Sequence, residues 1–486
     1  MSLSSALFSG ISGLNTLGNA MTVIGDNIAN VNTTGFKSSR ATFQDVLSQT
    51  VSTTAGSSQV GRGTSLADIA STFAQGSFAS TDSATDLAIG GEGFFVVREP
   101  NNTNNEFYTR AGEFRFDRDG NFTTPAGYIV RGWALDPDTG ATQGSVGDIM
   151  LSSFTSSPSE TDELTVITNL NSGSTNNSSG SNTSLSEQWD GNLTTPLGDS
   201  NYDYQSTLKV YDSLGDTNDI TMYFDRGEST GVWEYVVTCN PSDDERSIFD
   251  ASSDGGYGML GRGTITFSSS SGAMQDITFS RFVGNTNGGD PDDMTAAACW
   301  DTQSTASDLT NGHFTCTPLF ITGGTAMTIE LDLGAAHDGT SWANNSLSTS
   351  QFASSSTTIF QSANGYGAGD LQSVSVGTDG AITGQYSNGE VIPLYQVALA
   401  KFQNQNGLYK VGGNLFKETR ISGVPITGTA GANGLGNISS NSLEQSNVDI
   451  ATEFVKMITT QRGFQANSKI ITVTDQMLAE VIALKR

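Results

Sequence analysis

The sequence predicts a mainly β protein of several nested domains, with α-helical coiled-coil termini and antiparallel β-structure in the outer domains. Three observations support this prediction. Apolar residues recur at helical spacing at both ends of the chain, alternating strand patterns fill most of the middle, and Gly, Ser, Thr and Asn are frequent between them. A chain of 486 residues is long enough for two or three domains with substantial cores.

The first helix is expected within residues 1–33. It has no charged residue before Asp26 and is rich in Ser, Asn, Thr and Gly, which are mediocre helix formers. Such a segment is expected to be largely unfolded alone in water, so we interpret it as folding on association with neighbouring subunits. Its apolar positions alternate by three and four residues, with only Gly10 out of place, as in a coiled-coil seam: Leu3, Leu7, Leu14, Leu17, Met21, Ile24, Ile28 and Val31.

Residues 34–79 come next and are polar, with scattered apolar anchors. Together with residues 429–444 they are expected to form an extended linker arm. Strand patterns then fill residues 80–153 and recur in the same style at 357–428, including the turns Asp119-Gly120 and Asp379-Gly380. Two sequence-distant blocks of matching style predict one discontinuous β domain.

The intervening residues 154–356 have the size of an ordinary domain and are predicted to form an inserted outer β domain. Residues of about 240–350 are poorly patterned, and both a subdomain and long surface loops remain open for them. Hinges are expected near 153 and 357, where the chain passes between the two β domains.

The last helix is expected within residues 445–486, and with residues 1–33 it would form a terminal coiled-coil assembly domain. Gln461, Ser468 and Asp475 interrupt one flank of its stripe, so they are candidates for facing a water-filled channel. Pairing of the two terminal helices within a monomer is the alternative to assembly. The apolar residues recur every seven positions, with two more on the adjoining position: Ile450, Met457, Phe464, Ile471 and Leu478, then Phe454 and Ile482.

The charge and the titratable residues argue against several classes of function. A formal net charge of −28 argues against nucleic acid, whose phosphates need a basic face. His313 and His337, the two histidines of the chain, lie in no recognisable metal or triad spacing, so we expect no enzyme, no metal site and no cofactor. Residues 117–121 begin like a calcium loop but lack its closing glutamate, and we interpret them as a hairpin turn.

The cysteines and the N-terminus give information on disulfide formation and on the route of any export. Cys239, Cys299 and Cys316 imply no disulfide framework, and a bridge between Cys299 and Cys316 and buried thiols both remain open. The N-terminus lacks the basic region, apolar core and cleavage site of a secretory signal, and no window is apolar enough to cross a membrane. Any export is therefore expected to occur without N-terminal cleavage.

Two segments at the ends resemble the signatures of the bacterial flagellar axial family, which includes rod and hook proteins. They are residues 27–37 (NIANVNTTGFK) and residues 442–449 (SLEQSNVD) with 461–469 (QRGFQANSK). The positions that carry the resemblance are Asn27, Asn30, Asn32, Gly35, Phe36, Lys37, Asn447, Val448, Gln461, Arg462, Gly463 and Phe464.

Interior segments favour the hook branch of this family. Residues 87–95 (LAIGGEGFF) and 109–112 (TRAG) are similar to distal rod proteins as well. Residues 210–215 (VYDSLG), 386–389 (YSNG) and 400–404 (AKFQN) are similar to hook proteins. The resemblance is weak from about 240 to 355, where the outer domain is expected to be elaborated.

The resemblance implies a structural subunit that polymerises into the flagellar hook, a flexible tubular universal joint that transmits torque from rod to filament and encloses the export channel. It implies a helical homopolymer outside the cell, without membrane insertion. Its expected partners are the distal rod protein, the hook-filament junction protein, the hook cap protein and the flagellar type III export apparatus. A junction or distal rod protein is one alternative, and a β-rich surface adhesin, suggested by exposed aromatics such as Trp300 and Trp342, is another.

Overall fold

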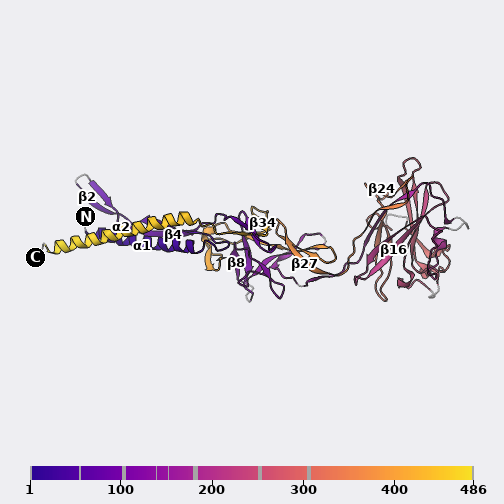
Figure 1. The fold of residues 1–486 in the computed structure, drawn as a ribbon, viewed down its shortest axis with the longest axis horizontal. Helices are drawn as coiled ribbons and strands as arrows, with labels where there is room; N and C mark the ends of the chain where they lie inside the picture. Colours follow the sequence, from indigo (N-terminus) through magenta and orange to yellow (C-terminus); the bar gives the residue numbers. More distant parts are fainter. Residues whose placement is uncertain are drawn as a thin grey trace. The chain divides into compact units, whose positions relative to one another are not determined.

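The computed structural model describes residues 3–53, 56–100, 105–137, 139–151, 153–178, 184–249, 254–303 and 308–483. The chain forms two compact units: unit 1 comprises Met1–Phe154 and Leu371–Arg486, and unit 2 comprises Thr155–Asp370. Antiparallel sheets dominate both, and an α-helix lies near each end of the chain (Figure 1). The predicted fold class, mainly β with helical termini, is confirmed.

The two long helices both belong to unit 1 and lie side by side (Figure 1). They are α1 (Leu3–Ala29) and α2 (Ile450–Ala483). Asp449 begins α2, because its Oδ1 accepts hydrogen bonds from the backbone N–H of Ala451 at 2.9 Å and Thr452 at 3.4 Å. Within the described residues, neither helix has a stretch apolar enough to span a bilayer.

The region expected as an extended arm contains paired strands instead of an isolated extended chain. A hairpin lies against α1, where the Thr64 N–H donates to Ser12 Oγ at 3.2 Å. Further along, short strands from both halves of the chain pair with each other. The antiparallel pairs are β1 (Ser39–Asp45) with β4 (Thr64–Ser71), β2 (Gln49–Thr53) with β3 (Gly56–Val60), β5 (Phe78–Ser80) with β35 (Ser442–Glu444), and β6 (Leu87–Gly90) with β34 (Asn437–Ser440).

One large sheet joins the early and the late β blocks of unit 1. β11 (Ile129–Leu135) is hydrogen-bonded to β7 (Phe94–Arg98) on one side and to β29 (Val391–Val397) on the other. The predicted hairpin turn at 117–121 is confirmed, because it connects paired strands β9 and β10. The other strands are β8 (Glu106–Thr109), β9 (Arg115–Phe116), β10 (Phe122–Thr123), β12 (Thr142–Asp148), β27 (Gly369–Val376), β28 (Ala381–Tyr386), β30 (Leu399–Lys401), β31 (Tyr409–Gly412), β32 (Leu415–Lys417) and β33 (Ile426–Gly428).

Unit 2 contains an antiparallel sheet whose strands follow chain order. They are β15 (Tyr204–Tyr211), β16 (Thr217–Arg226), β17 (Val232–Cys239), β18 (Met259–Phe267), β19 (Met274–Phe282) and β20 (Trp300–Gln303). A second sheet is mixed, because β14 (Glu163–Asn171) runs parallel to β22 (Ile329–Asp332) and β25 (Ser350–Phe352) and antiparallel to β26 (Thr357–Ala363). The remaining strands are β13 (Thr155–Ser156), β21 (Phe314–Cys316), β23 (Ala335–His337) and β24 (Trp342–Asn344).

Short 3₁₀ turns interrupt both units. They are η2 (Leu185–Gln188), η3 (Pro241–Asp243), η4 (Gly284–Asn287) and η5 (Ala297–Cys299) in unit 2, and η6 (Gln405–Gly407) in unit 1. The chain from about 240 to 350, which the sequence left open, contributes strands to both sheets of unit 2. It is therefore an integral part of the two sheets of unit 2.

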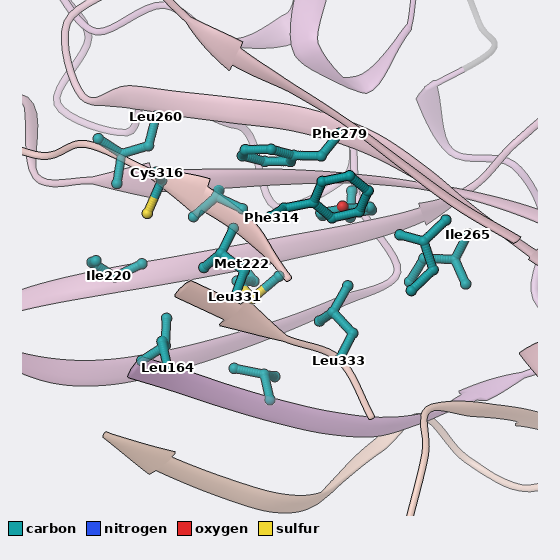
Figure 2. Close-up of a cluster of buried hydrophobic side chains, with 14 of the residues drawn as sticks. Leu164, Ile220, Met222, Leu260, Ile265, Phe279, Phe314, Cys316, Leu331 and Leu333 are labelled. Atoms are coloured by element: carbon teal, nitrogen blue, oxygen red, sulfur yellow. The ribbon is translucent and has the colours of Figure 1, made fainter. Parts of the chain in front are cut away.

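The core of unit 2 lies between its two sheets (Figure 2). Met222 and Phe279 from the antiparallel sheet meet Leu164 and Leu331 from the mixed sheet, and all four are buried. Alternating inward side chains of two packed sheets give this arrangement. Phe314 of β21 packs into the same cluster.

Two expectations about this unit need correction. The boundary expected at 357 lies at 370, because β26 pairs with β14 inside unit 2. Trp300, expected to be exposed, is buried beside Phe282. Of the two possibilities left open for the cysteines, the structure has buried free thiols, and Cys299 and Cys316 form no bridge.

Trp233 provides a test of this core, because its side chain is fully buried among the strands of unit 2. Trp233→Ala is expected to lower the free energy of unfolding of unit 2 by about 3–5 kcal/mol, through lost burial and an unfilled cavity. Amide hydrogen exchange of the full chain measures this, and protection in unit 1 should not change. Trp233→Phe is the matched control and should cost less, because the buried Trp233 Nε1 donates no hydrogen bond to any of the described residues, so none is lost. Equal losses for both variants would contradict this account.

Candidate assembly surface

Small residues allow α1 and α2 to approach each other closely. A methyl group at Gly10 would lie 3.1 Å from Ile471 Cγ1, and one at Gly13 would lie 2.6 Å from Asn467 Nδ2. On α2, a methyl group at Gly463 would lie 3.2 Å from Leu17 Cδ1. The glycine that interrupts the apolar pattern of the first helix is therefore a contact point between the helices.

The predicted seam of α1 faces inward along most of its length. Ile24 is buried, and the side chain of Leu3 lies outside the described residues. Thr16, Ala20 and Asn27 are buried on the same helix. The other seam residues are half-buried: Leu7, Leu14, Leu17, Met21, Ile28 and Val31.

The predicted seam of α2 is only partly buried. Met457, Ile471 and Leu478 are half-buried on the side of the helix that also carries the buried Glu453 and Thr474. The remaining four members of the seam are exposed: Ile450 (44%), Phe454 (48%), Phe464 (44%) and Ile482 (68%). Gln461, Ser468 and Asp475 are exposed as well.

Exposed apolar side chains continue along the whole of α2. We call this set the α2 apolar surface. A surface helix of a folded monomer normally turns such residues inward, so a long exposed apolar surface indicates an interaction site. The α2 apolar surface consists of Ile450, Phe454, Val455, Ile458, Phe464, Ile470, Val473, Met477, Val481 and Ile482.

A buried ionic cluster, which we call the junction, joins the bases of the helices to the β-structure of unit 1. Lys37 Nζ lies 2.6 Å from Glu444 Oε1, and Arg110 Nη1 lies 3.4 Å from Glu444 Oε2. Lys37 also donates to the Ala74 carbonyl at 2.9 Å, and the Gly76 N–H donates to Glu444 Oε1 at 2.9 Å. Burial lowers the pKa of the Lys37 ammonium, and the hydrogen bond and charge of Glu444 oppose that shift.

Two asparagines of the family-like signatures satisfy backbone groups around the junction. Asn27 both donates to the Ser39 carbonyl and accepts from the Ser39 N–H, each at 2.8 Å. Asn447 accepts from the Ser38 N–H at 2.8 Å and donates to the Thr72 carbonyl at 2.8 Å. A side-chain amide is the group that can both donate and accept in this way.

The remaining signature residues divide into two groups. Gly35 has a φ of +69°, and a methyl group there would lie 2.5 Å from the Ala111 nitrogen. Phe36 is buried, with Lys410 Nζ 5.5 Å from its ring centroid. Asn30 donates to the Asp26 carbonyl at 2.9 Å, near the end of α1. The others lie at half-buried or exposed positions: Asn32, Val448, Gln461, Arg462, Gly463 and Phe464.

Sequence reasoning missed Glu444, Arg110 and Glu453 as functional residues. Glu453 is buried between the helices, where it accepts from Asn27 Nδ2 at 3.3 Å and from Lys456 Nζ at 2.6 Å. Glu444 and Arg110 lie within segments that resemble the family, and a charged residue in such a segment was the available signal. What the sequence did not reveal is that these charges are buried.

Family models match four parts of the chain. "Flagella basal body rod protein" matches residues 7–37, and "Flagellar basal body rod FlgEFG protein C-terminal" matches residues 439–484. "Flagellar hook protein FlgE/F/G D1 domain" matches residues 88–166. "Flagellar basal body protein FlaE D2 domain" matches residues 186–366. The matched segments therefore include most of α1, the whole of α2 and large parts of both units.

Full-length relatives carry one common name. The chain is 32% identical to flagellar hook protein FlgE of Borreliella burgdorferi, over 99% of both chains. It is 32% identical to flagellar hook protein FlgE of Treponema pallidum, also over 99% of both chains. It is 29% identical to flagellar hook protein FlgE of Salmonella typhimurium, over 98% of both chains.

The geometry of the junction predicts that replacing Glu444 by an uncharged residue strongly lowers the stability of unit 1. Glu444→Gln leaves the buried Lys37 without its carboxylate and is expected to destabilise unit 1 by about 3–5 kcal/mol, measured by urea unfolding. Glu92→Gln is the control, because the pair that Glu92 forms with Lys401 is solvent-exposed and should contribute less than about 1 kcal/mol. Lys37→Met combined with Glu444→Gln should recover part of the loss. Similar effects of Glu444→Gln and Glu92→Gln would contradict the role of the junction.

The start of α2 is expected to loosen in acid. Hydrogen bonds from the Thr452 hydroxyl and from the backbone of Thr452 and Ala451 hold the pKa of Asp449 below its usual value. The stabilisation is therefore present above about pH 4, the unfolded pKa, and is lost as the pH falls through the lowered folded pKa. Amide exchange protection at Ala451 and Thr452 should decline over that range. Asp449→Asn accepts the same bonds without titrating, so its protection should stay flat; a decline in both proteins would contradict the assignment.

Proposed function

The chain belongs to the flagellar hook protein family, and we propose that its terminal helices form the surface through which copies of it polymerise. Members of this family are structural subunits of the flagellar hook, and the chain is such a subunit. Its place is the hook of the flagellum, and its main partner is a further copy of itself. Its role is architectural.

The observation that supports polymerisation through the helices is the α2 apolar surface. α1 already occupies one face of α2, so the apolar residues on the remaining surface are available to neighbouring subunits. Phe8 (63%) and Ile11 (46%) add exposed apolar area on α1. A pair of helices with a further apolar face is typical of helices that pack in layers, because each new neighbour buries another face.

The polar flank of α2 suggests an orientation within such a tube. Gln461, Ser468 and Asp475 are spaced by seven residues and are exposed, so we propose that they face a water-filled export channel. Exposed apolar residues on the opposite side of α2, such as Val455, Val473 and Met477, would then pack against neighbouring helices. This orientation places polar groups in water and apolar groups in contacts, as solvation requires.

The division of the chain into two units suggests how a hook could bend while transmitting torque. We propose that the helices and unit 1 provide firm contacts, whereas the two connections at 154–155 and 370–371 let unit 2 shift during rotation. The further proposed partners are the distal rod protein, the hook-filament junction protein, the hook cap protein and the type III export apparatus. Export would proceed without cleavage of the N-terminus.

Substituting charged residues into the α2 apolar surface tests the proposal that subunits polymerise through it. Val455→Asp combined with Val473→Asp is expected to abolish tube formation, because each subunit contact would bury unpaired carboxylates. The helix pair should survive, since both positions are exposed in the monomer. Electron microscopy detects tubes, and circular dichroism checks the helices.

Leu214→Asp is the control for this experiment, because Leu214 is equally apolar and 68% exposed but lies in unit 2. This variant is expected to assemble. Tubes of normal length from the double variant on α2 would refute the assignment of the polymerisation surface.

A further inference from the structure

Two aliphatic side chains of a short loop in unit 1 are exposed to solvent. Ile421 is 73% exposed and Val424 is 79% exposed, whereas Ser422 between them is fully buried. Ser422 Oγ donates to the Thr419 carbonyl at 2.8 Å, and the Thr419 N–H donates to Ser422 Oγ at 2.9 Å. These hydrogen bonds within the loop hold its conformation. We call the two exposed residues, Ile421 and Val424, the knob.

The loop is also tied to the turn that begins β31. Thr419 Oγ1 donates to the Gly407 carbonyl at 2.6 Å, and the Asn404 N–H donates to the Ser422 carbonyl at 3.3 Å. Because these hydrogen bonds already restrict the loop, the knob loses little conformational freedom on binding. Two β-branched side chains held rigidly in water cost solvation energy, which contact with a partner would recover.

A groove lies at the other end of β31. Its volume is 670 Å³, within the range of about 300–1,000 Å³ that is typical of binding pockets. It is lined by the N-terminal signature, by the turn after β10 and by the β31–β32 turn, including Thr33, Thr34, Pro125, Ala126, Val411 and Leu415. Pro125, Ala126 and Val411 are exposed there.

We propose that the knob of one subunit inserts into the groove of the next copy of this chain. The knob and the groove are different surfaces of unit 1, so their contact is heterologous, and a heterologous contact that does not close into a ring repeats from copy to copy into an open helical assembly. One pair of charges is complementary, because Arg420 is exposed beside the knob and Glu113 lines the groove. The proposal rests on the polymerisation proposed above and adds a contact outside the terminal helices.

Cross-linking between two differently labelled subunits tests the contact. One subunit carries Val424→Cys and the other Ala126→Cys, and a short bis-maleimide is added to the mixture before and after tubes form. The native cysteines are buried, which limits background reaction. A covalent heterodimer is expected in tubes and not in monomers. The pair Leu214→Cys with Ala126→Cys is the control, and it should give no heterodimer.

The outcomes separate this proposal from the one on which it rests. Tubes without the Val424–Ala126 heterodimer, or with Val424 homodimers instead, would overturn the knob-in-groove contact alone. Failure of the unmodified chain to form tubes would overturn polymerisation as well. Ile421→Asp combined with Val424→Asp provides a second measurement, and tube elongation should slow more than about tenfold. An unchanged elongation rate would also overturn the contact.

Discussion

The rest of unit 1 depends on the neutralisation of buried charge around Glu444. One carboxylate, wholly removed from water, lies between a lysine from the N-terminal half and an arginine from the first β block. None of these groups would be stable in the interior without the others, because an unpaired buried charge is costly. The pairing therefore requires three distant parts of the chain to meet, and it places the end of α1 beside the start of α2.

This meeting point explains why the helices need not be stable alone. Once the junction brings α1 and α2 together, Gly10 and Gly13 allow close contact, Ile24 becomes buried and Ile471 becomes half-buried. The pairing within a monomer, which the sequence left as an alternative to assembly, is present, yet it uses only one side of α2. Intramolecular pairing and polymerisation are thus compatible, since they use different faces of the same helix.

Sequence reasoning was most successful where local patterns determine structure. The spacing of apolar residues identified both helices, and the Asp-Gly turns identified hairpins whose strands are paired. It was less successful where tertiary context decides. Gly10 looked like an interruption because its partner Ile471 is more than 400 positions away. Phe464 and Ile471 share a heptad position, yet one is exposed and the other half-buried. The domain boundary was misplaced because Thr357–Ala363 resembles any other polar strand until its partner β14 is known.

The connectivity of the two units has an evolutionary consequence. The chain enters unit 2 at β13 and leaves it at β27. These two neighbouring strands are paired, Thr155 with Asp370 and Ser156 with Gly369. A domain inserted through a closed pair of strands can lengthen, shorten or be exchanged without disturbing the sheet that receives it. Selection can therefore remodel unit 2 independently, while the residues that hold the two ends of the chain together stay under a separate constraint.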